Sequence, residues 1–230
     1  MLFPFLTSTR LYRFPIVTVG IVVANVVVFF LTRHTLLSTA QNWGFVTADS
    51  VGGTFASLGH FHVLQTLVTH TFLHAGWAHL LGNMWMLAVF GAALEMRIGS
   101  LPLVIAYVLF GILAVLCQGV FHAGPARPVI GASGAISGVL GCFLALEPRS
   151  RVLSLFFVGI GLFLTEVPSL FYMGVWLLLQ IDGIQTHFLT GPDFQNIAWW
   201  AHLGGFSAGV CVGLVGRSLE IHASNEEENS

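Results

Sequence analysis

Charged residues are scarce in this chain, and lysine is missing altogether. Only 8% of the 230 residues are charged, whereas a soluble domain carries roughly 25%. So few charges cannot cover a soluble surface, and 56% of the residues are hydrophobic. The net charge of -2 provides no basic patch for nucleic acid. The composition therefore predicts an integral protein of the lipid bilayer, without a nucleic-acid partner.

The sequence also lacks the residue spacings that are typical of disulfide frameworks and metal sites. Cys117, Cys142 and Cys211 all lie in apolar runs, and we interpret them as small core residues. His70 and His74 are four residues apart, but no Glu or third ligand accompanies them as an HExxH site requires. We expect no metal and no cofactor, and we assign these two histidines to a hydrogen-bond network under the first loop.

Six apolar runs approach the length of about 20 residues that a membrane-spanning helix needs. We predict such helices over residues 14–32, 77–96, 101–121, 131–146, 167–181 and 197–219. The predicted fold class is an all-α polytopic membrane protein, with a six-helix domain over 14–219, a cytosolic N-terminal segment over 1–13 and a disordered acidic tail over 220–230. The first run has no small-residue cleavage site after it, so we expect a retained anchor.

Three links between the predicted helices need an interpretation. Residues 33–76 are mixed in polarity and predict a loop or a partly submerged hairpin. Residues 152–164 precede Pro168 and are too short to span, so we interpret them as an interfacial or re-entrant piece. Residues 182–196 are a polar loop, which either covers the site as a lid or only connects two helices.

The arginines give the orientation, because cytoplasmic segments are enriched in them. With both termini inside, six arginines lie inside and two outside. The inside group is Arg10, Arg13, Arg97, Arg149, Arg151 and Arg217, and the outside group is Arg33 and Arg127. We therefore predict cytosolic N- and C-termini.

This topology brings polar residues to one depth below the outer face. Ser133 lies two residues into the fourth predicted helix, His79 two into the second and His202 five into the sixth, at about 1.5 Å of rise per residue. Asn83 lies one turn below His79 on the same helix face. Polar side chains inside a membrane are costly and are functional candidates by default.

Small residues recur beside this layer and allow helices to approach closely. They are Gly131, Gly134, Gly138 and Gly141 in the fourth predicted helix, and Ala201, Gly205, Gly209 and Gly213 in the sixth. Packing alone would account for the glycines, but not for a serine and a histidine beside them.

These motifs resemble those of the rhomboid intramembrane serine proteases, in their bacterial six-helix form. Gly131-Ala132-Ser133-Gly134 is similar to the family's GxSG motif, Ala201-His202 with Gly205 and Gly209 to AHxxGxxxG, His79 with Asn83 to HxxxN, and Glu95-Met96-Arg97 to E-x-R. His74 stands five residues before His79, as in many members. The resemblance covers residues 69–214, with the motifs in the same order.

The resemblance implies a dyad without a third acid, in which Ser133 is the nucleophile and His202 the general base. The oxyanion would be bound by the backbone N–H of Ser133 and the side chains of His79 and Asn83. The residues expected to support this site are His74, Gly131, Gly134 and Gly205. The implied substrates are transmembrane segments of other membrane proteins, cut near the outer face of a bacterial cytoplasmic membrane. The fifth helix would be the lateral gate.

Two positions depart from the family pattern. Ser137 stands where many members carry an aromatic ring that stacks on the catalytic histidine, and it is a second candidate nucleophile. Gln65-Thr66 stands where some bacterial members carry a Trp-Arg pair. Two other functions stay open: a non-catalytic relative that binds membrane proteins, and a transporter or channel, which would need polar residues through the whole membrane depth.

Overall fold

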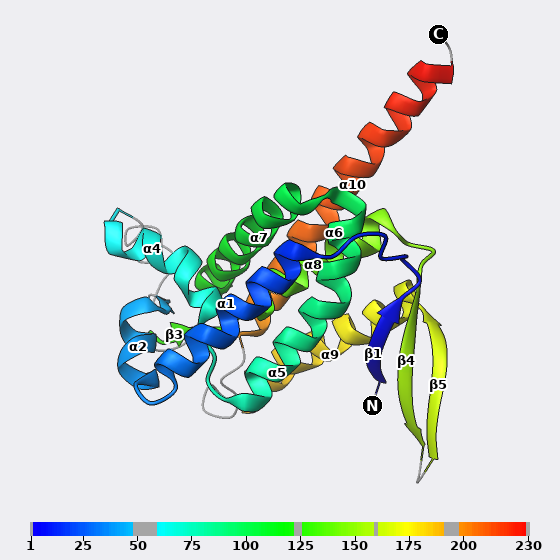
Figure 1. Cartoon of the computed structure of the whole chain (residues 1–230). Helices are drawn as coiled ribbons and strands as arrows, with labels where there is room; N and C mark the ends of the chain where they lie inside the picture. The colour runs from blue at the N-terminus through cyan, green and yellow to red at the C-terminus, as the bar shows by residue number, and fades with distance from the viewer. Residues whose placement is uncertain (1, 48–58, 122–125, 159–160, 191–197, 229–230) are drawn as a thin grey trace.

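The computed structural model describes residues 2–47, 59–121, 126–158, 161–190 and 198–228. Helices make up most of the chain and pack side by side, and α10 and a β-hairpin project from them (Figure 1). The helices are α1 (Ile16–Thr32), α2 (Leu36–Trp43), α4 (Phe61–Thr69), α5 (Trp77–Met86), α6 (Ala92–Ile98), α7 (Ser100–Phe121), α8 (Ser133–Leu146), α9 (Ser169–Thr190) and α10 (Trp199–Glu228). A π-helical turn, η2 (Leu87–Gly91), joins α5 to α6, and a 3-10 turn, η1 (His70–Phe72), precedes α5.

The first four predicted membrane helices agree with the structure within two residues at each end. They correspond to α1, to the continuous α5–η2–α6 helix, to α7 and to α8. Pro15 stands at the N-cap of α1, and Gly99 ends α6 with a φ of 93°. Glycine adopts that left-handed conformation without strain, which is why apolar runs bounded by glycine and proline predict helix ends well.

Two small sheets contradict the all-α prediction. β1 (Leu2–Thr7), β4 (Arg151–Val158) and β5 (Gly161–Pro168) form an antiparallel sheet in the order β1-β4-β5. We predicted an interfacial or re-entrant piece over 152–164, where β4 and the first half of β5 lie, and a cytosolic segment over 1–13, which contains β1. The side chains of this segment suit a strand as well as a helix, and pairing supplies its backbone with hydrogen-bond partners. β2 (Phe45–Val46) and β3 (Pro128–Val129) form the second sheet.

The last two helices are longer than predicted. α9 begins directly after Pro168 but continues to Thr190, into the stretch predicted as a loop; residues 191–196 of that loop lie outside the described residues. α10 runs to Glu228, where we predicted a disordered tail from residue 220, and its end extends beyond the other helices (Figure 1). A helix that is already formed gains a backbone hydrogen bond with each added residue, and Glu and Ala favour this extension.

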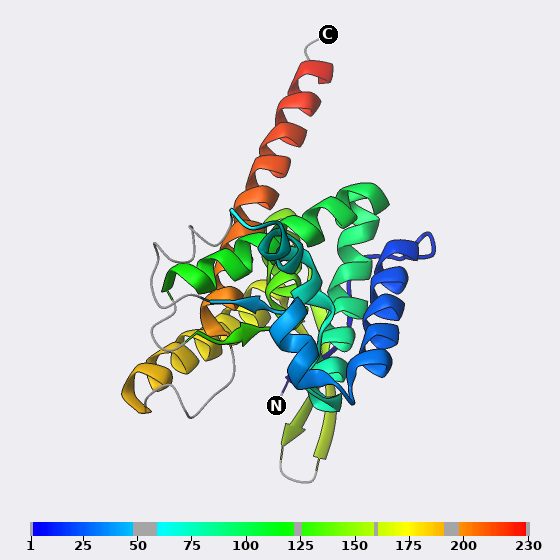
Figure 2. The same cartoon turned by 90° about the vertical axis from the view of Figure 1, so that its left-hand side faces the viewer.

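The described residues between α1 and α5, 33–47 and 59–76, are folded, where we predicted a loop or hairpin. It contains α2, β2, α4 and η1, and β2 pairs with β3 directly ahead of α8 (Figure 2). The backbone N–H of Gly131 donates to the carbonyl oxygen of His70 at 2.9 Å. This stretch is therefore attached to the chain that enters α8.

Glu95 connects the start of α1 to the end of α6. Its fully buried carboxylate accepts hydrogen bonds from the backbone N–H groups of Val17 (3.1 Å) and Thr18 (2.8 Å) and from the hydroxyls of Thr18 and Ser100. The free N–H groups of a helix start need such an acceptor. Arg97, two residues later, forms an ion pair with Glu147 at 2.9 Å. The E-x-R motif therefore lies away from Ser133 and stabilises helix ends.

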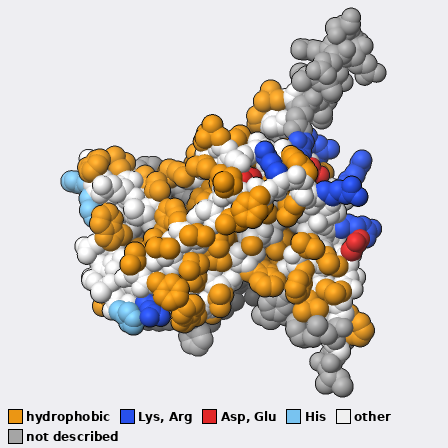
Figure 3. Space-filling model, viewed as in Figure 1, with side chains coloured by type: hydrophobic (Ala, Val, Ile, Leu, Met, Phe, Trp, Pro, Cys, Tyr) orange, Lys and Arg blue, Asp and Glu red, His pale blue; other side chains and the backbone are white. Residues whose placement is uncertain are grey.

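α8 lies at the centre of the bundle, and all but two of its residues are buried. The outer helices instead expose large apolar side chains, which cover most of the face in Figure 3, while most of the arginines in view gather toward one end. Such a surface suits lipid. By length and hydropathy, two helices of the described residues could cross a membrane, 77–98 and 100–121; 16–32, 133–146 and 169–181 are apolar but shorter. The count of six crossings stays a prediction.

Candidate active site

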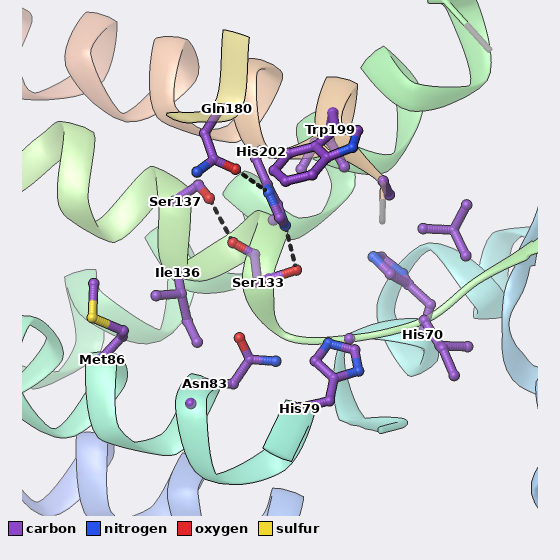
Figure 4. A pocket seen from close by; sticks show the side chains of 18 of the residues that line it. His70, His79, Asn83, Met86, Ser133, Ile136, Ser137, Gln180, Trp199 and His202 are labelled. Atoms are coloured by element: carbon purple, nitrogen blue, oxygen red, sulfur yellow. Dashed lines mark hydrogen bonds between the residues drawn. The ribbon is translucent and has the colours of Figure 1, made fainter. Parts of the chain in front are cut away.

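A serine and a histidine from two different helices meet near the start of each helix. Ser133 is the first residue of α8, and His202 lies in the first turn of α10. The Oγ atom of Ser133 is 2.8 Å from Nε2 of His202 (Figure 4). The nucleophile and base expected from the sequence are thus joined by a direct hydrogen bond.

Glycines let α8 and α10 approach closely enough for this contact. A Cβ atom added to Gly205 would overlap the carbonyl oxygen of Gly134, and one added to Gly209 would overlap that of Gly138. The two helices therefore pack backbone against backbone. A side chain at these positions would push α10, and His202 with it, away from Ser133.

Gly131 shapes the entry into α8. Its φ is 125°, a conformation that residues with a side chain rarely adopt. A Cβ atom here would lie 2.7 Å from both Cε1 and Nε2 of His79 and 3.7 Å from Oγ of Ser133. The glycine thus allows the turn into the helix and leaves room for the imidazole that covers it.

His79 and Asn83 face Ser133 from α5, one turn apart (Figure 4). The backbone N–H of Ala75 donates to Nδ1 of His79 at 3.4 Å, so a neutral ring carries its proton on Nε2. The Nδ2 atom of Asn83 is buried and has no hydrogen-bond partner among the described residues. An unpaired buried donor costs about 1–3 kcal/mol. Asn83 therefore holds a free donor close to Ser133.

The two other histidines of this region differ in their surroundings. Nδ1 of His70 donates to the carbonyl oxygen of Thr66 at 2.8 Å, and burial lowers the pKa of His70 to about 4. Neither ring nitrogen of His74 has a hydrogen-bond partner in the part of the chain that the structure describes. Its ring instead packs edge-on against His79, with centroids 5.0 Å apart. His70 thus forms a hydrogen bond of the predicted kind, while the contact of His74 with His79 is one of ring packing.

Three residues surround His202 that the sequence analysis did not assign to the site. Nδ1 of His202 is 2.7 Å from Oε1 of Gln180, which comes from α9 (Figure 4). The indole of Trp199 meets the imidazole edge-on at 5.9 Å between centroids, and that of Trp176 lies at 6.3 Å. Gln180 is the lone polar residue in the apolar run 175–181. Because an amide in a membrane helix needs a hydrogen-bond partner, this isolated glutamine is the sequence feature that could have indicated a residue of the site.

A cavity of about 620 Å³ lies in front of these groups. Its lining includes His79 and Asn83 from α5, Ser133 and Ser137 from α8, Trp176 and Gln180 from α9, and His202 from α10. The hydroxyl of Ser137 donates to the backbone carbonyl of Ser133 at 2.7 Å, and Ser137 is 1% exposed. Ser133, not Ser137, is therefore the serine whose hydroxyl contacts the imidazole.

The part of the chain that contains these residues is similar in sequence to known proteins. The family model described as "Rhomboid domain" matches residues 61–219. The chain is 30% identical over 171 residues to RHOMBOID-like protein 1 of Arabidopsis thaliana, covering 74% of this chain and 39% of the relative. It is 31% identical over 145 residues to Rhomboid-type serine protease 2 of Emericella nidulans (62% and 25%), and 29% identical over 153 residues to Rhomboid protein 1, mitochondrial, of Saccharomyces cerevisiae (64% and 40%). The chain thus spans less than half the length of each of these three relatives.

Proposed function

The chain belongs to the rhomboid family of integral membrane proteins, and on that premise we propose that it is a serine endopeptidase that cleaves transmembrane segments of other membrane proteins. One observation carries the proposal: the 2.8 Å contact between Oγ of Ser133 and Nε2 of His202, beside a cavity that the side chains of α5 also line. The printed name of the Emericella nidulans relative, a rhomboid-type serine protease, supports the same reaction.

The proposed reaction is acyl transfer in two steps. Nε2 of His202 takes the proton of the Ser133 hydroxyl while Oγ attacks the carbonyl carbon of the scissile peptide bond. The C–N bond then breaks, and His202 passes the proton to the leaving amine. In the second step His202 takes a proton from water, the hydroxide attacks the acyl-enzyme, and the proton returns to Oγ of Ser133.

The negative charge that develops on the carbonyl oxygen needs donors that are already in place. We assign this role to the backbone N–H of Ser133, to Nε2–H of His79 and to Nδ2–H of Asn83. The unpaired Nδ2 atom and the hydrogen bond from Ala75 to Nδ1 of His79 support this assignment. Each such donor contributes about 2.7–4 kcal/mol toward the transition state.

We further propose that the cut lies near the outer membrane face and that both termini are cytosolic. The positions of the arginines support this orientation. Arg97 lies at the end of the helix that begins near His79, and Arg149 and Arg151 follow the end of α8, which begins at Ser133. Positive charge thus lies at the end of these helices opposite to the dyad, as the positive-inside rule requires. The three relatives above come from a plant and two fungi, and they give no support to the expected bacterial cytoplasmic membrane.

The test uses the purified full chain in liposomes with a reporter transmembrane substrate and a fluorophosphonate probe. We expect cleavage and labelling in the wild type and a loss of at least about 10³-fold in Ser133→Ala and in His202→Ala, because the two residues act as a unit. Ser137→Ala is the matched control, and it should be labelled and active. Labelling that survives Ser133→Ala would refute the nucleophile. Substrate binding without cleavage by the wild type would favour a non-catalytic rhomboid protein.

A further inference from the structure

Gln180 is a buried amide, 6% exposed, in the apolar part of α9. A buried amide group that is left without a hydrogen bond is costly, so most buried amides are hydrogen-bonded at both ends. Its Oε1 atom is 2.7 Å from Nδ1 of His202, and its Nε2 atom donates to the backbone carbonyl of Trp176 at 3.1 Å. Each end of the amide therefore has one partner, and one of the two is the imidazole of the dyad.

The carbonyl of Trp176 decides which way the amide points. A backbone carbonyl only accepts hydrogen bonds, so the NH₂ group must face Trp176 and the oxygen must face His202. An amide oxygen also only accepts. Nδ1 of His202 must therefore carry the ring proton, and Nε2 of the neutral ring is left with a lone pair directed at the hydroxyl of Ser133. This is the tautomer that a general base needs.

The rotated amide would have the opposite effect. An NH₂ group facing Nδ1 would draw the proton to Nε2 and leave no lone pair for Ser133, which is the wrong tautomer for catalysis. Trp176 and Trp199 limit the imidazole from two further sides, with Trp199 at an interplanar angle of 87°. The two tryptophans thus restrict the plane of the His202 ring, and Gln180 determines which of its nitrogens is protonated.

We propose that Gln180 is the positioning residue of the active site and completes a hydrogen-bonded series Ser133–His202–Gln180; this inference rests on the proposed function. Gln180 keeps one proton on Nδ1 of His202 throughout the reaction and neither gains nor loses an atom. Because the amide is neutral, it orients the imidazole without the charge stabilisation that a carboxylate would add.

The test compares Gln180→Met with Gln180→Glu in the reconstituted full chain. The methionine has a similar length but no strong acceptor, and we expect kcat to fall roughly 10²-fold with KM little changed, because general-base catalysis is typically worth 10²–10⁴-fold. The glutamate keeps an acceptor oxygen in place, and we expect it to retain kcat within about tenfold of the wild type. An equal loss in both variants would refute the acceptor role.

A second readout is independent of activity. In protein labelled with ¹⁵N-histidine, the signals of His202 are identified by difference from His202→Ala. We expect a proton on Nδ1 in the wild type and its redistribution toward Nε2 in Gln180→Met. An unchanged tautomer in Gln180→Met would overturn the proposal. If the wild type proves inactive, the proposed function fails, while this readout still decides whether Gln180 sets the tautomer.

The chain offers a matched control for packing. Gln118 of α7 is 8% exposed, and its Oε1 accepts a hydrogen bond from the backbone N–H of Ala201 at 3.1 Å, directly beside His202 in sequence. Gln118→Met therefore also removes a buried amide that contacts α10, but not one that contacts the imidazole. We expect a comparable loss of stability with an unchanged His202 tautomer. If Gln118→Met shifts the tautomer equally, packing of α10 explains the effect and Gln180 has no special role.

Discussion

Replacing Gly131 by alanine should damage both the fold and the site, for reasons that can be separated. The φ of 125° costs a residue with a side chain about 1–3 kcal/mol. The new Cβ would also lie 2.7 Å from two ring atoms of His79, where carbon atoms normally stay about 3.5–4.0 Å apart. Relieving that overlap moves the ring by about 1 Å, and overpacking of this kind costs about 1–3 kcal/mol. We expect a total loss of about 2–6 kcal/mol.

The same shift should slow the reaction. A misplacement of about 1 Å at a catalytic group can cost 10²-fold in rate. We therefore expect the rate of fluorophosphonate labelling of Ser133 to fall about 10²-fold in the folded Gly131→Ala protein, with stability measured by equilibrium unfolding in mixed micelles. Gly20→Ala is the control, because its added Cβ would meet no atom within 4 Å apart from the neighbouring backbone of its own helix. Glycine inside a helix is less stable than alanine by roughly 0.5–1 kcal/mol, so this variant should be slightly stabilised.

A double variant tests whether the overlap with His79 is the cause. Gly131→Ala combined with His79→Ala removes the ring that the new methyl group would meet, so about 1–3 kcal/mol of stability should return. Labelling should stay slow, because the proposed oxyanion donor is also lost. Equal stability of the double variant and Gly131→Ala would refute the steric explanation, and unchanged labelling of Gly131→Ala would refute the role of this contact in the site.

Three further predictions concern stability. Glu95→Ala leaves the N–H of Thr18 buried without its acceptor and should cost about 2–4 kcal/mol by equilibrium unfolding. Gly209→Val places a side chain against the carbonyl of Gly138 and should lower the thermal midpoint and the labelling rate together. Burial lowers the pKa of His70 to about 4. Between about pH 6.5 and 4, the His70 imidazole is therefore protonated in the unfolded chain but neutral in the folded chain. Stability should therefore fall by up to about 3 kcal/mol as the pH drops from about 6.5 to 4, and less in His70→Gln.

The parts of the fold that depend on local sequence could be predicted. α1, α7 and the α5–η2–α6 helix are apolar runs bounded by Pro15 and by Gly99, and such boundaries are visible in the sequence. The pairing of Ser133 with His202 could also be expected, since both lie near the start of helices that enter from one side. Depth along a helix follows from counting residues, and the glycines of α8 and α10, also visible in the sequence, allow the two helices to approach closely.

The parts that depend on distant partners could not be predicted. The β4–β5 hairpin is a short apolar segment, which periodicity cannot distinguish from a helix, and its further partner is β1 at the start of the chain. Gln180 lies 22 residues from His202, and nothing in the run 175–181 indicates which helix its amide will face. Whether a lone polar residue in an apolar helix contacts the site or only its own backbone is decided by helix rotation, which a single sequence does not contain.

Ser137 and Gln180 together explain how the proposed dyad can be aligned without an aromatic ring one turn after Ser133, the ring that the family resemblance leads us to expect there. Ser137 is small, its hydroxyl folds back onto the carbonyl of Ser133, and it leaves the space beside His202 in which the amide of Gln180 lies (Figure 4). An aromatic ring on α8 would move with the nucleophile as part of one helix. Here the support for the imidazole comes from α9, which is attached separately through the contact of Tyr172 with Phe90 and the hydrogen bond between Ser150 and Ser169. The alignment of the dyad therefore depends on α9 staying packed against α8 and α10, so that any displacement of α9 also removes the acceptor that holds His202 in its basic tautomer.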